Sequence, residues 1–215
     1  METVESANRG KLFVFEGVDG GGKTSVCDSV AEILRSEGHE VVKLTEPTRE
    51  SQWGREIRER SAFGELTPGE ELELFLRDRE WHIKNRIKPA LDAAKIVLMD
   101  RYFFASGAYQ STSTGLHWRE ILRRNREEIH APEPDIVFIL DLPVEVGLER
   151  VSTRKLTLNQ QFEQYDRLVK VRQAYLEMVS EDSGRFSIID ATKKLKEVVD
   201  EVHQQIIEFL DEPPA

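Results

Sequence analysis

The chain has 215 residues, a formal net charge of −10 and one cysteine, Cys27. That length predicts one domain spanning 1–215. A single cysteine excludes an internal disulfide framework and favours a reducing, cytoplasmic setting. The acidic balance argues against nucleic acid as the main partner, because that binding depends on a basic surface. Residues 1–10 lack an apolar stretch and no apolar run approaches a membrane span, so neither a signal peptide nor a membrane partner is expected.

Short apolar runs alternate with helical patterns along the chain. Strands are predicted at Lys11–Glu16, Glu40–Leu44, Lys95–Asp100, Asp135–Leu140 and Phe186–Asp190. The spacing of apolar residues predicts helices at Lys23–Arg35, Pro68–Ala94, Trp118–Glu128, Val144–Thr153, Gln160–Val179 and Lys193–Leu210. Strands that are apolar throughout are buried on both faces. The alternation therefore predicts a three-layer α/β/α fold around a five-stranded parallel sheet.

The first predicted strand runs directly into a glycine-rich loop, Gly17–Thr24, which reads GVDGGGKT and fits G-x-x-x-x-G-K-[ST]. Glycines let backbone N–H groups turn toward phosphate oxygens, and the helix that follows adds partial positive charge. Lys23 supplies a full charge for the β and γ phosphates, and Thr24 a hydroxyl ligand for Mg²⁺. The loop residues expected to bind ATP are Gly17, Asp19, Gly20, Gly21, Gly22, Lys23, Thr24 and Ser25.

The context of this loop favours phosphate binding over the alternative, a glycine-rich turn with a chance lysine. The loop follows a predicted strand and opens a predicted helix, as a P-loop must. A GTPase would usually carry an Asn/Thr-Lys-x-Asp motif for guanine, and the sequence contains none. Kinase chemistry is therefore favoured.

Further candidate residues follow other strands, at the sheet edge where ligands of such folds bind. Asp100 is expected to hold Mg²⁺ through water or to orient an attacking oxygen, and Arg101 to clamp a phosphate. An exposed ion pair at a strand end is the alternative. Phe75 and Arg79 share a helical face that suits a nucleobase, by stacking and by edge hydrogen bonds. The alternative is that Phe75 is core and Arg79 solvated.

A basic group, Arg150, Arg154 and Lys155, precedes a polar stretch after the fourth predicted strand. One interpretation is a short lid at about 152–163 that closes over the transferring phosphate and brings an arginine to its charge. The other is a solvated helix end whose cations offset the helix dipole. The residues alone leave both open.

Taken together, these motifs resemble the thymidylate kinase family of P-loop nucleoside monophosphate kinases, over roughly Lys11 to Leu210. The segments that carry the resemblance are Phe15–Thr24 (FEGVDGGGKT), Leu74–Arg79 (LFLRDR) with His82 and Lys88–Leu91 (KPAL), Asp100–Tyr102 (DRY) with Ala108–Gln110 (AYQ), Pro134–Asp135 (PD) with Leu140–Pro143 (LDLP) and Gly147–Arg150 (GLER), and Ile189–Ala191 (IDA).

The resemblance implies roles on the acceptor side. Phe75 would stack on the acceptor base and Arg79 would hydrogen-bond its edge. Arg101 would hold the acceptor phosphate, Asp19 would approach the sugar 3′-hydroxyl, and Tyr109 would crowd the 2′ position and so favour deoxyribose. The acceptor-binding residues expected from the family pattern are Asp19, Glu46, Pro47, Arg49, Phe75, Arg79, Arg101, Ser106, Tyr109 and Gln110.

On the donor side, the resemblance implies that Arg150 and Ala191 border the adenine of ATP. Family members without an arginine before the second loop glycine, where this chain has Gly21, supply one from the lid, which points to Arg154. Metal contacts are expected from Thr24 and Asp100. The catalytic residues expected are Lys23, Asp100, Arg101 and Arg154.

The chain departs from the family pattern at several positions, which are Thr45 and Arg49 around the Glu46–Pro47 pair, Arg77 beside Phe75, Ala105 where serine is usual, Ser111 after the AYQ segment, and Asn159–Glu163 in place of D-R-x-E. These departures affect the assignment of dTMP as the acceptor more than the assignment of a nucleotide as the acceptor.

The sequence thus predicts Mg²⁺-dependent transfer of the γ-phosphoryl group of ATP to dTMP, and the resemblance implies a homodimer. One alternative keeps the enzyme class and changes the acceptor to another nucleoside monophosphate or a nucleoside. The other is a nucleotide-dependent regulator without a phosphoryl acceptor.

Overall fold

The structure is a computed structural model that describes residues 9–151, 158–182 and 184–212. Its centre is a five-stranded parallel sheet in the order β2-β3-β1-β4-β5. The strands are β1 (Lys11–Glu16), β2 (Val41–Thr45), β3 (Ile96–Asp100), β4 (Ile136–Asp141) and β5 (Phe186–Asp190). The predicted sheet is confirmed, with each strand end within one residue of its expected place.

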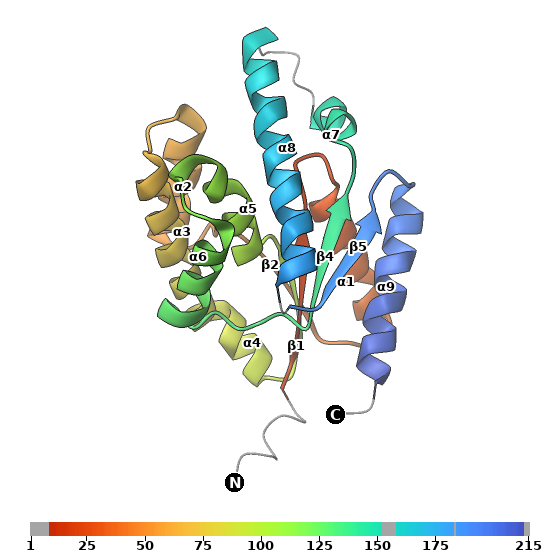
Figure 1. Ribbon diagram of the computed structural model, residues 1–215. Coiled ribbons are helices and arrows are strands. Elements are labelled where there is room, and N and C mark those ends of the chain that lie inside the picture. The colour runs from red at the N-terminus through yellow and green to blue at the C-terminus, as the bar shows by residue number, and fades with distance from the viewer. Residues whose placement is uncertain (1–8, 152–157, 183, 213–215) are drawn as a thin grey trace.

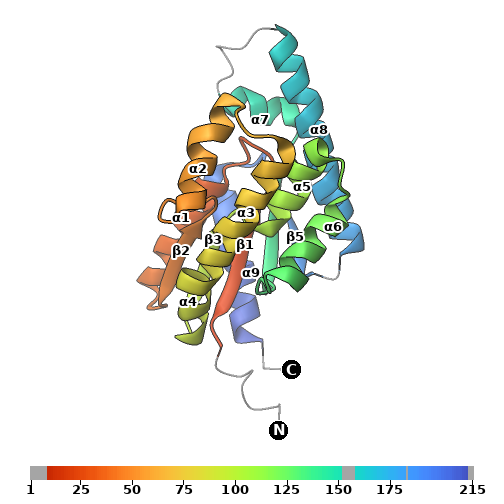
Figure 2. The ribbon, with the colours of Figure 1, turned by 90° about the vertical axis from the view of Figure 1, so that its left-hand side faces the viewer.

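Helices cover both faces of the sheet (Figures 1 and 2). On one face lie α1 (Lys23–Ser36) and α9 (Leu195–Asp211), and the other face carries α5 (Phe103–Thr114) and α8 (Leu158–Glu181). The remaining helices are α2 (Gln52–Arg60), α3 (Pro68–His82), α4 (Lys88–Asp92), α6 (Trp118–Arg123) and α7 (Val144–Val151), with a 3₁₀ turn at Ser61–Phe63 and π-helical turns at Ile83–Ile87 and Arg124–Glu128. This arrangement is the predicted three-layer α/β/α architecture.

Burial follows position in the sheet. All five residues of β3 are buried, and so are five of the six in both β1 and β4, because these strands lie between neighbours and under helices. The edge strands β2 and β5 each have a single buried residue. Phe13 of β1 packs edge-on against Phe209 of α9, with ring centroids 5.6 Å apart. The central strands are therefore the rigid support from which the loops at their carboxyl ends project.

The helix predicted at Pro68–Ala94 is interrupted where Pro89 removes a backbone donor. A proline inside a helix lacks the N–H that would bond the residue four positions earlier, and its ring presses on that carbonyl. The chain accommodates it with the π-helical turn at Ile83–Ile87, so that α4 starts at Lys88 with Pro89 in its first turn. The prediction that this segment is helical is confirmed, but the prediction of one uninterrupted helix was wrong.

Two helices, α2 and α5, were not predicted. The first contains Gly54 and the second contains Gly107 with several Ser and Thr residues, all of which lower helix propensity. Tertiary packing stabilises both. An added Cβ at Gly54 would lie 2.3 Å from the Thr48 carbonyl oxygen, so only glycine allows this close approach.

The glycine-rich loop packs directly on α7. Gly20 has a φ of 84°, and an added Cβ there would lie 2.2 Å from the Gly147 carbonyl oxygen. Conversely, a Cβ on Gly147 would lie 2.6 Å from the Asp19 carbonyl oxygen. Because both obstacles are backbone atoms, neither can rotate away.

Replacing Gly147 by alanine is therefore expected to push α7 away from the loop. We predict a melting temperature lowered by about 3–8 °C, from about 1–3 kcal/mol of overpacking. Gly69→Ala in α3 is the matched control, because nothing lies within 4 Å of its added Cβ, and it should be neutral or slightly stabilising. Equal melting temperatures for Gly147→Ala and the wild type would contradict this account.

Candidate active site

The parallel pairing of β1 with β3 brings the glycine-rich loop beside the Asp100–Arg101 pair. Phe15 lies opposite Asp100 in the register, and the Arg101 amide donates to the Phe15 carbonyl at 3.1 Å. The next residues of the two strands are Glu16 and Arg101, so Gly17 begins the loop at the level where Arg101 leaves the sheet. The two motifs that the sequence singled out therefore lie side by side.

The loop has the backbone that anion binding requires. Gly17, Gly20 and Gly22 all adopt positive φ values of 133°, 84° and 81°. Gly22 immediately precedes α1, and no side chain in the described part of the chain caps that helix. The first N–H groups of α1 therefore remain available to an anion, reinforced by the positive end of the helix dipole.

Lys23 folds back onto the loop. Its ammonium group donates to the carbonyls of Gly17 at 2.9 Å and Val18 at 2.8 Å, and the side chain is buried. Burial, followed by repulsion from Arg101, lowers the pKa of Lys23 to about 8. An incoming phosphate would replace two carbonyl dipoles by a full negative charge, which favours the protonated lysine.

Thr24 and Asp100 present the oxygen atoms that a magnesium ion uses. The Thr24 hydroxyl donates to Asp100 Oδ2 at 2.5 Å, and Asp100 is buried at the end of β3. Magnesium is commonly held by one or two protein oxygens together with water and substrate phosphates. Within the described residues no cluster of three or more His, Cys, Asp or Glu side chains offers another metal site. The donor set therefore fits Mg²⁺ that arrives with a nucleotide.

A pocket of about 690 Å³ opens in front of the loop. The predicted site residues that line it are Asp19, Gly20, Gly22, Lys23, Thr24, Ser25, Glu46, Pro47, Phe75, Arg79, Asp100, Arg101, Ser106, Tyr109 and Gln110. These residues come from the loop, α1, the end of β2, α3, the end of β3 and α5. The structure thus brings together residues spread over 92 positions of the chain, from 19 to 110.

Within this pocket Arg101 pairs with Asp19, and the guanidinium lies 5.1 Å from the centroid of the Tyr109 ring. Burial raises the pKa of Tyr109 to about 12, so its hydroxyl stays protonated at neutral pH. That hydroxyl has no hydrogen-bond partner among the described residues. A buried polar atom without a partner in a pocket is a candidate contact for a polar ligand.

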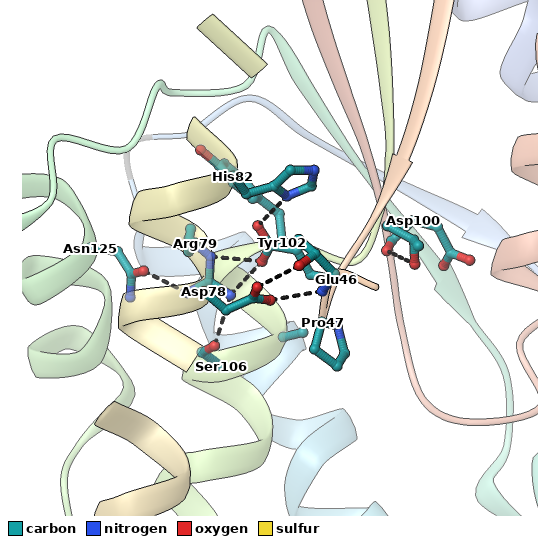
Figure 3. Close-up of polar contacts among 12 residues, drawn as sticks. Glu46, Pro47, Asp78, Arg79, His82, Asp100, Tyr102, Ser106 and Asn125 are labelled. Atoms are coloured by element: carbon teal, nitrogen blue, oxygen red, sulfur yellow. Dashed lines mark hydrogen bonds and ion pairs between the residues drawn. The ribbon is translucent and has the colours of Figure 1, made fainter. Parts of the chain in front are cut away.

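Arg79 lines the pocket and is almost fully buried. Figure 3 shows its polar contacts. Its Nε donates to Glu46 at 2.8 Å, and its terminal nitrogens donate to Asn125 at 2.6 Å and Ser106 at 3.1 Å. Nδ1 of His82 lies 3.1 Å from the other Glu46 oxygen. These three hydrogen bonds, together with a 2.7 Å contact between a terminal nitrogen and Glu46, occupy four of the five guanidinium N–H groups and leave one for a ligand. The alternative of a solvated Arg79 is wrong.

The Glu46–Arg79 pair illustrates how a buried charge is stabilised. Burial disfavours the ionised carboxylate of Glu46, but the charge of Arg79 outweighs it, and the pKa of Glu46 falls below its ordinary value. The pair places α3 against the segment that follows β2. It therefore fixes the position of Phe75, one turn before Arg79 on the same helix.

The residues that depart from the family pattern differ in whether they line the pocket. Arg77 and Arg49 are exposed, and neither lines the pocket. A contact between Arg49 and the acceptor stays a prediction. Thr45 and Ala105 do line the pocket.

Two arginines that line the pocket were not predicted from the sequence. Arg58 of α2 lines the pocket and donates to the carbonyls of Pro47 and Thr48. Arg167 of α8 also lines it, 5.9 Å from the centroid of the Tyr109 ring. No local motif marks either residue, because each reaches the pocket only through the packing of its helix.

A second pocket of about 360 Å³ lies on the other side of the loop. The predicted donor-site residues that line it are Gly20, Gly21, Gly22, Ser25, Arg150 and Ala191. Arg150 donates to the Ala191 carbonyl at 2.9 Å and reaches the Gly20 carbonyl at 3.3 Å. Leu195 and Val198 of α9 add apolar surface suited to a flat ring.

The predicted lid, about 152–163, falls partly outside the described residues. Arg154 and Lys155 lie in the part that the structure does not describe, and α8 begins at Leu158. The helix predicted at Val144–Thr153 is seen to Val151, the last residue before that gap. The role expected of Arg154 stays a prediction.

Leu72 and Leu76 of α3 form a small buried cluster with Ile121 of α6. They are core within this chain. Among the described residues, no helix is both long and apolar enough to cross a bilayer.

Comparison with known proteins gives a consistent result. A family model described as thymidylate kinase matches residues 15–202. A probable thymidylate kinase of Archaeoglobus fulgidus is 43% identical over 201 residues, which cover 93% of this chain and 96% of the relative. A thymidylate kinase of Desulfotalea psychrophila is 42% identical over 77% of this chain and 80% of its own length. A thymidylate kinase of Xanthomonas euvesicatoria is 37% identical over 97% of this chain and 88% of its own length.

The Glu46–Arg79 pair gives a pH-dependent prediction. Because the folded-state pKa of Glu46 lies below its ordinary value of 4.5, its stabilising effect is present above that pH and is lost as the pH falls. Glu46→Gln should lower the free energy of unfolding by about 3 kcal/mol at pH 7, and by less below pH 4.5. Denaturant unfolding at several pH values measures this difference.

Glu50→Gln is the matched control, because the Glu50–Arg86 pair is about half exposed and should contribute below about 1 kcal/mol. A Glu46→Gln effect as small as that of the control, or one independent of pH, would show that the buried pair does not stabilise the pocket wall.

Proposed function

This chain belongs to the thymidylate kinase family, and we propose that it transfers the γ-phosphoryl group of ATP to dTMP, giving ADP and dTDP. One observation carries the proposal beyond family membership. The two pockets share Gly20, Gly22 and Ser25 of the phosphate loop. A triphosphate whose base occupies the smaller pocket would lay its phosphates along the loop, with the terminal one facing the larger pocket.

The donor is held at the smaller pocket. Leu195 and Val198 provide the apolar wall for the adenine, and Arg150 borders it. The inward N–H groups of the loop and of the first turn of α1 bind the phosphates, and Lys23 turns from the loop carbonyls to the β and γ phosphates.

The acceptor is held at the larger pocket. Phe75 stacks on the thymine ring, and Arg79 donates its remaining N–H group to the base edge. Tyr109 stands at the sugar, where its bulk disfavours a 2′-hydroxyl. Arg101 exchanges Asp19 for the acceptor phosphate, and Asp19 then becomes free to accept from the sugar 3′-hydroxyl.

Phosphoryl transfer requires positioning and charge neutralisation more than covalent help. Thr24 and Asp100 would hold Mg²⁺, which when bound neutralises charge on the phosphates. Lys23 and Arg101 approach the reacting group from opposite sides, so the two anions can be brought together against their repulsion. The lid arginine Arg154 would add positive charge to the transferring group.

Several wider expectations belong to this proposal. We place the protein in the cytoplasm, which fits its single, buried and free thiol at Cys27. A net charge of −10 fits small nucleotides bound by local cations and not a nucleic acid partner. We further propose a homodimer, in keeping with the family. The lid and the rest of the chain would form one domain.

A coupled assay with ATP, Mg²⁺ and a panel of nucleoside monophosphates tests the proposal. We expect the highest kcat/KM with dTMP, and loss of turnover by at least about a thousandfold in Lys23→Ala with the fold retained. Lys196→Ala is the control, because that lysine is exposed on α9. ATP hydrolysis that no monophosphate alters would indicate a regulator, and a different preferred monophosphate would reassign the acceptor.

The role proposed for Arg154 gives a separate kinetic prediction. If it acts on the transferring phosphoryl group, Arg154→Ala should lower kcat by about a hundredfold or more while the KM for dTMP changes little. Steady-state kinetics with each substrate varied in turn measures both constants. A raised KM with an unchanged kcat would move Arg154 from the transition state to ground-state binding.

A further inference from the structure

Glu16, the last residue of β1, is a fully buried carboxylate with no place in the proposed chemistry. It precedes the first glycine of the phosphate loop. Burial, opposed by hydrogen bonds and by nearby cations, raises the pKa of Glu16 to about 7. A buried carboxylate is costly unless its oxygens are satisfied, so its partners show what it is used for.

The partners of Glu16 come from two other elements. Oε1 accepts from the amides of Tyr102 at 2.8 Å and Ala105 at 3.0 Å, at the start of α5. Oε2 accepts from the hydroxyl of Tyr175, on α8, at 2.8 Å. The residue before α5, Tyr102, provides no side-chain cap of its own. Glu16 therefore caps α5 from a neighbouring strand and joins it to α8.

This cap holds a strained residue in place. Arg101 has a φ of 71°, a left-handed conformation that costs a non-glycine residue about 1 kcal/mol or more. Its own amide is bonded to the Phe15 carbonyl and the next amide, of Tyr102, to Glu16. The last two residues of β1 thus fix both peptide groups around the strained Arg101.

We propose that Glu16 is a positioning residue, which holds Arg101 in the backbone conformation that directs its guanidinium to the acceptor phosphate and ties this conformation to α8 through Tyr175. The inference rests on the proposed function, because it takes Arg101 as the acceptor-phosphate ligand. Glu16 touches no substrate in this account and acts only through Arg101 and α5.

Loss of the Glu16 side chain should weaken binding of the acceptor and leave binding of the donor nearly unchanged. In Glu16→Ala the Tyr102 amide loses its acceptor, whereas the Ala105 amide keeps its 3.1 Å bond to the Tyr102 carbonyl. Arg101 is then free to relax from its left-handed conformation. The Kd for dTMP should rise by about tenfold or more, while the Kd for ATP·Mg should change by less than about threefold. Titration calorimetry with each nucleotide alone measures both constants.

Glu16→Gln shows whether the hydrogen bonds of Glu16 or its negative charge support dTMP binding. Its amide oxygen can accept from Tyr102 and Ala105, and its amide nitrogen can donate to the Tyr175 oxygen. The Kd for dTMP should therefore recover to within about threefold of the wild-type value. Glu32→Ala, which removes an exposed carboxylate from α1, is the control for charge loss and should change neither constant.

A double-mutant cycle shows whether Glu16 acts through Arg101. Arg101→Ala alone should weaken dTMP binding, and adding Glu16→Ala to it should weaken binding little further, because no guanidinium remains to be positioned. Additive losses in the double variant would overturn the proposal, and so would equal losses of ATP and dTMP binding in Glu16→Ala.

Amide hydrogen exchange in the nucleotide-free protein gives a readout independent of the substrate. The Tyr102 amide, which has Glu16 as its acceptor, should be protected in the wild type and in Glu16→Gln, and exposed to exchange in Glu16→Ala. Unchanged protection in Glu16→Ala would overturn the proposal. A wild-type protein that binds no dTMP would refute the proposed function instead, and these exchange rates would still decide whether Glu16 fixes the segment around Arg101.

Discussion

The parallel pairing of β1 with β3 determines where every later part of the site lies. Both strands are buried between neighbours, and their register ends them at the same level. The phosphate loop therefore leaves the sheet beside Asp100 and Arg101, and an anion on the loop faces a second cation across a short gap. This edge is where open parallel sheets bind ligands, because crossovers carry the chain away and leave a crevice.

Electrostatics at this edge explain how an acidic protein can bind two anions. The chain carries a net charge of −10, yet Lys23 and Arg101 are held close together against their mutual repulsion. Internal acceptors stabilise them in the nucleotide-free protein, carbonyls for Lys23 and Asp19 for Arg101. In the proposed reaction, phosphates replace these internal acceptors.

The sequence predicted those parts of the molecule that have a local signal. Continuous apolar runs located all five strands, and the loop motif located Lys23 and Thr24. Residues whose role arises from packing were not found. Arg58 and Arg167 reach the pocket through helices that no motif marks, whereas Arg77, which follows Phe75 in sequence, is exposed outside the pocket. The helix α5, which has several Ser and Thr residues and one Gly, has low helix propensity and is stabilised by packing against its neighbours.

The central claim is that one chain places a triphosphate and an acceptor phosphate on either side of the same loop and passes the terminal group directly between them. Incubation with ATP labelled at the γ-phosphorus, Mg²⁺ and dTMP tests it most directly. We expect the label to appear in dTDP, one for each ADP formed, with no labelled inorganic phosphate beyond background. Label released as inorganic phosphate at the same rate with and without dTMP would contradict it.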